Sequence, residues 1–239
     1  MLSASALNEP SATYELVAAV LHSPTLLQHA DFAAPLQKLR TMAQTEHDPQ
    51  AMVLLGRVSL LLANQDEALV WFRKSTEKSC GFEGAGEALV QEGRILLGKG
   101  ERGGAERAFR KAAMEVDEPS GFFYLSQLQE MGSREQEIYL LKAAGAGIVE
   151  ACHNLGSLEM GKVGEGGREG RSMAMAREWF EVAAADGFAP SMLNLAELCR
   201  VDGRKEEGLM WLDRAEGLGK EVAKEVGRIR DQWRTSRVS

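Results

Sequence analysis

The side chains best suited to chemistry are too widely spaced to form a familiar catalytic or metal site. The four histidines show no H-x-x-x-H or HExxH spacing, so we expect no zinc ligand set. The three cysteines, Cys80, Cys152 and Cys199, have no CxxC spacing, which predicts small core residues in a reducing compartment. There is also no GxSxG motif, Cys–His arrangement or obvious pair of catalytic carboxylates. We therefore expect a protein that is not an enzyme and has no metal or cofactor.

Two glycine-rich stretches could in principle cradle phosphate. Gly98–Gly103 matches GxGxxG, but a dinucleotide fingerprint needs a preceding strand, and Ile95–Leu97 ends a predicted helix. We interpret that stretch as a turn. The segment 161–170 lacks GKS or GKT and predicts a flexible loop between two helices. This loop is either a plain surface insertion or a contact for a partner.

The composition narrows the classes of partner. The formal charge of −7 argues against direct nucleic-acid binding, which needs clustered Lys and Arg. The basic end of the chain, from Lys220 to Arg237, is interpreted as a solvated helix, with an anionic-partner site as the alternative. No apolar run reaches about 18 residues, so we expect no membrane insertion. We expect an intracellular protein, either cytoplasmic or mitochondrial.

Two short segments recur along the chain and must set the positions of everything else. The first segment begins and ends with a small residue and has a leucine just before its last residue. It occurs at Ala51–Gly56, Gly121–Ser126, Ala151–Gly156 and Ser191–Ala196. The second is a large residue followed by small ones, as in Trp71–Ser75, Ala108–Ala113, Tyr139–Ala144, Trp179–Ala184 and Trp211–Ala215. Their period of roughly 35 residues is typical of stacked helix pairs. We name the two helices of each pair A and B, and the chain is predicted to be all-α.

The second unit can be aligned in two ways. Matching by distance makes Ala88–Gly93 its helix A segment, and Glu92 then takes the place of the leucine. A frame that starts at Ala85 restores Leu89 but lengthens the following loop.

The combined pattern resembles the Sel-1-like repeat, a subclass of the tetratricopeptide-like superfamily. The fourth unit carries it best, through Ala151, Leu155, Gly156, Ala176, Trp179, Phe180, Ala183, Ala184 and Gly187. The resemblance implies a right-handed α-solenoid of about five to six antiparallel helix pairs. Residues 1–50 would form N-terminal capping helices, 51–219 the repeat array, and 220–239 a C-terminal capping helix and basic tail. Some units depart from the pattern, since Ser126 and Ala196 replace glycine.

In relatives of this kind, helix A lines the concave face, and the positions just before and two after the recurring leucine point inward. On this chain the resemblance therefore implies a peptide-binding face that includes Arg57, Arg94, Gln127, Asn154, Asn194 and Glu197. Asparagine can donate and accept together, which suits the backbone of an extended peptide. Arg57 and Arg94 would hold a carboxylate of that peptide.

The expected function is a non-enzymatic adaptor or scaffold for a protein or extended peptide, within a larger complex in some relatives. One alternative is a mitochondrial complex-assembly or translation-associated factor of the same fold. A second is a hydrolase on a helical-repeat scaffold, although three isolated cysteines do not supply the disulfide-bonded helix pairs of such relatives.

Overall fold

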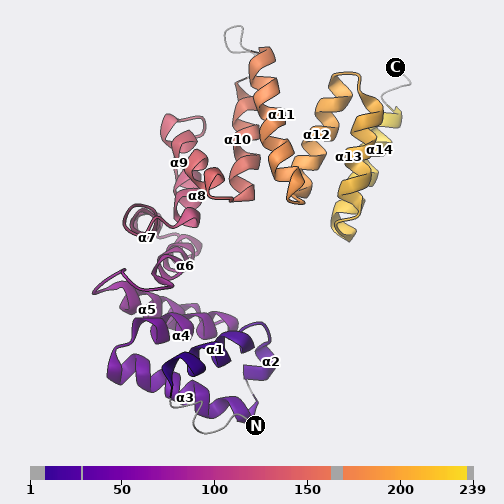
Figure 1. The fold of residues 1–239 in the computed structure, drawn as a ribbon. Coiled ribbons are helices and arrows are strands. Elements are labelled where there is room, and N and C mark those ends of the chain that lie inside the picture. Colours follow the sequence, from indigo (N-terminus) through magenta and orange to yellow (C-terminus); the bar gives the residue numbers. More distant parts are fainter. Residues whose placement is uncertain (1–8, 28, 163–168, 236–239) are drawn as a thin grey trace. The chain divides into compact units, whose positions relative to one another are not determined.

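The described part of the chain is built from helices alone. The computed structural model describes residues 9–27, 29–162 and 169–235, and these contain fourteen α-helices and no strand (Figure 1). The predicted all-α class is confirmed. The chain divides into two compact units, Met1–Leu125 and Ser126–Ser239, and each is described by itself.

The N-terminal unit starts with the helices α1 (Pro10–Val20), α2 (Pro24–Leu27) and α3 (Ala33–Thr41). Two complete helix pairs follow, α4 (Pro49–Leu61) with α5 (Gln65–Thr76), and α6 (Ala85–Gly98) with α7 (Arg102–Glu115). The helix α8 (Pro119–Leu128) straddles the division between the units.

The C-terminal unit continues with α9 (Arg134–Gly145) and then two complete pairs. These are α10 (Val149–Gly161) with α11 (Glu169–Ala185), and α12 (Ala189–Val201) with α13 (Lys205–Glu216). The helix α14 (Lys220–Thr235) ends the unit. Most of the glycine-rich segment predicted as a loop, residues 163–168, lies outside the described residues.

Local sequence explains where the A helices begin. Proline, which suits the first helical turn because it lacks an N–H, stands at the start of α4, α8 and α12. The Asp48 carboxylate also caps α4, accepting hydrogen bonds from the backbone N–H groups of Gln50 at 2.9 Å and Ala51 at 3.4 Å.

Glycine and phenylalanine lock three of the helix pairs together. A Cβ built on Gly56 would lie 2.5 Å from the Phe72 ring, and one on Gly156 would lie 2.5 Å from the Phe180 ring. Gly93 stands in the same relation to Phe109, at 2.4 Å. Helix A can approach this closely only because these positions lack a side chain. The contact between Gly93 and Phe109 also confirms the alignment in which Ala88–Gly93 is equivalent to Ala51–Gly56. Glu92 therefore does replace the leucine of the repeat.

The last pair uses a different combination of side-chain sizes. Ala196 takes the place of the helix A glycine, and the phenylalanine position is Leu212; both are fully buried in one cluster. A larger residue on helix A is thus matched by a smaller one on helix B, which keeps the core close-packed.

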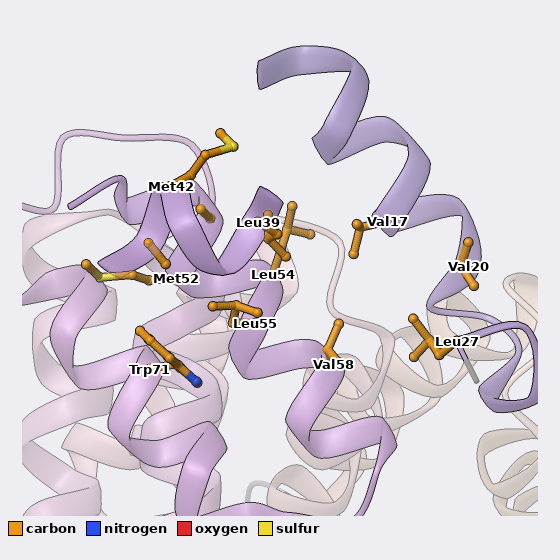
Figure 2. Packing of buried hydrophobic residues seen from close by; sticks show 12 residues of the cluster. Val17, Val20, Leu27, Leu39, Met42, Met52, Leu54, Leu55, Val58 and Trp71 are labelled. Carbon is orange, nitrogen blue, oxygen red and sulfur yellow. The ribbon is translucent and has the colours of Figure 1, made fainter. Parts of the chain in front are cut away.

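The helices α1 and α14 pack against the first and the last complete helix pair, respectively. Figure 2 shows Val17 of α1 on the side of Leu54 of α4 and Val20 beside Leu27 of α2, all in the same buried cluster as Trp71. At the other end, Val226 and Trp233 of α14 pack into the cluster that contains Leu212. Helix α14 thus packs against the last pair.

Candidate peptide-binding surface

The two arginines of the predicted face are both engaged within the N-terminal unit. Arg57 lines a groove of about 440 Å³ between α1, α4 and the start of α6, where its Nε lies 3.4 Å from a carboxylate oxygen of Glu87. Arg94 does not line that groove; its Nη1 donates to Gln91 at 3.2 Å, and its guanidinium lies 5.9 Å from the centre of the Tyr124 ring. The groove that Arg57 lines therefore does not include Arg94.

The C-terminal unit places Asn154 in a groove of about 820 Å³ between α9 and α10. Asn154, Leu158 and Gly161 line it from α10, and their spacing of four and three residues places them on one stripe of the helix. Gln136 and Leu140 line the groove from α9. Polar amides thus alternate with apolar side chains along both walls.

A lysine supplies the charge at one end of this groove. The Lys162 ammonium lies 2.7 Å from the buried carboxylate of Glu159 and 3.4 Å from Glu137. The hydrogen bond with Glu159 raises the pKa of Lys162 further above its ordinary value, so the amine stays protonated at neutral pH. Two carboxylates therefore compensate the lysine, and the groove offers amides more than net charge.

The other predicted residues of this unit lie outside the groove. Gln127 is exposed, and Asn194 is partly buried. Among the residues that the structure describes, neither the Asn154 nor the Asn194 amide makes a hydrogen bond within the protein. Both amides are therefore available to water or to a partner.

Glu197 is held by the chain itself. Its carboxylate accepts a hydrogen bond from the Arg200 guanidinium at 2.9 Å and from the Trp233 indole N–H at 3.3 Å. The hydrogen bond from Arg200 lowers the pKa of Glu197, and the Trp233 bond adds to the effect. Glu197 thus remains half exposed, but its carboxylate is already engaged by Arg200 and by Trp233 of α14.

His153, next to Asn154, joins two consecutive A helices. Its Nδ1 lies 2.9 Å from the buried Ser191 hydroxyl of α12, and its ring lies between Phe180, at 5.4 Å, and Phe188, at 5.2 Å. Burial lowers the pKa of His153, because the apolar surroundings disfavour the imidazolium. The neutral histidine is a structural link that fixes α10 against α12.

The cysteines are free thiols. Cys152 and Cys199 are buried and Cys80 is partly buried. Burial raises the pKa of both the Cys152 and the Cys199 thiol, which disfavours the nucleophilic thiolate. Across the described ranges, no group of three or more His, Cys, Asp or Glu residues is arranged to hold a metal ion.

The comparisons with known proteins decide the fold. No protein-family model matches the sequence, and no curated protein matches it either. The structure is similar to that of a protective antigen of uropathogenic Escherichia coli with an SLR fold, with a TM-score of 0.71 and 23% identity over 93% of this chain. This chain spans 49% of the antigen, about half its length.

Two further solved structures match over most of both chains. A Sel1 repeat protein from Oxalobacter formigenes has a TM-score of 0.65 and 20% identity, over 90% of this chain and 89% of that one. This chain has the Sel1-like, tetratricopeptide-like repeat fold. Pseudomonas aeruginosa PilF has a TM-score of 0.68 and 16% identity, over 94% of this Sel1-like chain and 97% of PilF.

A Sel1-like fold accounts for the helix pairs. None of the helices in the described residues has the length and apolar character needed to cross a bilayer.

Two contacts of the surface were missed by sequence reasoning. The sequence contains a signal for the Trp233–Glu197 hydrogen bond, because an amphipathic α14 is predicted from apolar residues at helical spacing. These residues are Val222, Val226, Ile229 and Trp233. The His153–Ser191 hydrogen bond had none, since the two residues are 38 positions apart and neither lies in a motif.

Proposed function

We propose that this protein is a non-enzymatic adaptor that holds an extended segment of a partner protein in the groove between α9 and α10. The observation that carries the proposal is the placement of the Asn154 amide, with no partner of its own among the described residues, in a groove of about 820 Å³. An amide can donate to a peptide carbonyl and accept from a peptide N–H. Such an amide recognises the main chain of a peptide and not its particular side chains.

The rest of the groove suits the same ligand. Gln136 supplies a second amide from α9, while the partly buried Leu158 offers an apolar contact to a side chain of an extended segment. The Gln136 Nε2 donates to the Ser126 carbonyl at 3.4 Å, and its Oε1 accepts from the Gly132 N–H at 2.8 Å, so its orientation is fixed before a ligand arrives. A fixed side chain loses less entropy on binding.

The experiment combines affinity capture from a cell extract with cross-linking mass spectrometry. Wild type is compared with Asn154→Ala, with Asn194→Ala and with the double variant. The control is Gln37→Ala with Gln65→Ala, which removes two exposed amides from α3 and α5. We expect the captured partner to cross-link near α9 and α10, and to be lost in the Asn154 variants but kept in the control.

The outcome of the asparagine series is decisive. A folded double variant that retains every captured partner would refute the proposal. Cross-links confined to helices other than α9 and α10 would also refute it, because the partner would then bind elsewhere.

A further inference from the structure

Two grooves on the N-terminal unit share one lysine, Lys74. The first, of about 670 Å³, lies between the start of α4, the end of α5 and the loop that follows α5. The second, of about 570 Å³, lies between α5, α6 and α7. The four asparagine and arginine residues of the predicted helix A face, Arg57, Arg94, Asn154 and Asn194, line neither groove.

The first groove has an apolar floor. Met52 and Trp71 line it, each with under a tenth of its surface exposed, and the partly buried Phe82 lines it from the loop. The polar atoms beside this floor are already satisfied, since the Ser75 hydroxyl donates to the Phe72 carbonyl at 2.7 Å and the Trp71 indole N–H donates to Glu67 at 3.4 Å. Such a floor suits a bulky apolar side chain.

The walls of both grooves are basic. Five Lys and Arg residues line them against two Glu residues, in a chain whose net charge is −7. One of the two carboxylates, Glu92, is already paired with Arg73 at 2.9 Å. A positive surface on an acidic protein attracts the acidic groups of a partner.

Four of the basic side chains, Lys74, Lys78, Arg107 and Lys111, have no carboxylate partner among the described residues. The Lys111 ammonium donates to the Thr76 carbonyl at 2.9 Å, which leaves Lys74, Lys78 and Arg107 for an acidic ligand. The Lys74 ammonium lies 5.3 Å from the centre of the Trp71 ring, so the cation stands directly beside the apolar floor. A ligand that inserts an apolar side chain beside Trp71 would bring its neighbouring groups to Lys74.

We propose that the two grooves form a docking surface for an acidic segment of a partner protein. A bulky apolar side chain of that segment fills the first groove, and flanking carboxylates pair with Lys74, Lys78 and Arg107. The buried apolar anchor supplies most of the affinity, whereas the exposed ion pairs supply the association rate and the dependence on salt. This surface is separate from the groove between α9 and α10 and does not depend on the function proposed for it.

The test is direct binding of a short fluorescent peptide in which one phenylalanine is flanked on both sides by glutamates. We expect Lys74→Glu with Arg107→Glu to weaken binding by at least about tenfold, because attraction becomes repulsion at two positions. The matched control is Arg134→Glu with Lys220→Glu, which changes the net charge equally but lies in the C-terminal unit, at helix starts where acidic residues are favoured.

Peptide variants separate the two parts of the proposal. Replacing the glutamates with glutamines, or the phenylalanine with alanine, should each weaken binding by about tenfold or more. Should the double charge reversal fail to fold, the milder Lys78→Gln, at an exposed position, should still reduce affinity and the slope of its salt dependence.

Three results would overturn the proposal. The first is equal binding by the charge-reversed variant and wild type. The second is equal binding of the glutamine peptide and the glutamate peptide. The third is tighter binding of polyuridylate than of the peptide with the same sensitivity to Lys74→Glu and Arg107→Glu, which would make the surface a general anion site.

Discussion

Gly56 of α4 and Phe72 of α5 touch so closely that a methyl group on the glycine would lie 2.5 Å from the ring. The same contact recurs between Gly93 and Phe109 in the next pair. In the last pair Ala196 and Leu212 occupy the corresponding positions of one buried cluster. Residue sizes on the two helices of a pair therefore depend on each other.

This relation predicts that Gly56→Ala destabilises the protein and that Phe72→Leu partly restores it. The added methyl overpacks the contact and should cost about 1–3 kcal/mol, because the ring lies between two packed helices and cannot retreat. A leucine at position 72 would leave room, as in the Ala196–Leu212 pair. Urea unfolding of wild type, both single variants and the double variant gives the coupling free energy.

The control for the glycine substitution is Gly98→Ala. Gly98 ends α6, and a Cβ there would meet nothing within 4 Å, so the change should be neutral or slightly stabilising. Strictly additive effects of Gly56→Ala and Phe72→Leu would show that the two positions do not share the packing constraint.

His153 predicts a loss of stability in mild acid. Its pKa in the folded protein is below its ordinary value of 6.5, so the unfolded chain takes up the proton first as the pH falls. This contribution to the free energy of unfolding is therefore fully present above about pH 6.5 and declines as the pH falls toward the folded-state pKa. His153→Gln, which keeps a hydrogen-bonding group near Ser191, should flatten that part of the profile.

The measurement is urea unfolding at several pH values between about 5 and 7.5, where histidine titrates. His22→Gln, at an exposed histidine, is the matched control and should leave the profile unchanged. A His153→Gln profile as steep as that of wild type would mean that other groups cause the acid sensitivity.

We expect the Trp233 side chain to hold α14 against α13. The indole is almost fully buried, and a Cβ on Gly208 would lie 2.9 Å from it, which places the ring directly against α13. Trp233→Ala should cost about 3–5 kcal/mol of docking free energy and expose α14 to hydrogen exchange. It should also release the Glu197 carboxylate from its indole N–H partner.

Hydrogen exchange read by mass spectrometry distinguishes detachment of α14 from global unfolding. The matched control is Arg234→Ala on the same helix, where the side chain is 80% exposed. Unchanged protection of residues 220–235 in Trp233→Ala would contradict the role given to the indole.

The repeat itself was legible in the sequence because close packing of two helices demands particular residue sizes at fixed spacing. The glycines at 56, 93 and 156 and the phenylalanines at 72, 109 and 180 therefore predicted both the helices and their pairing. Prolines and Asp48 set the starts of A helices for an equally local reason, the missing or capped N–H groups of the first turn.

The binding residues were harder to predict because their availability depends on what packs beside them. Position in the repeat placed Arg57, Asn154 and Glu197 on equivalent faces, yet each has a different environment. Arg57 lies in a groove beside α1 and near Glu87, Asn154 lines a groove beside α9, and Glu197 is held by Trp233 from α14. The local sequence sets only the position of each residue in the repeat, and the packing of other helices sets its surroundings.

The sequence by itself thus determined the helical repeat, its register and the positions that hold each pair together, since these follow from spacing of three and four residues and from side-chain volume. Tertiary structure alone decided that His153 bonds Ser191 and that Lys74 is shared by two grooves. Those contacts join residues far apart in the chain, and no short-range preference of the backbone or side chains specifies them.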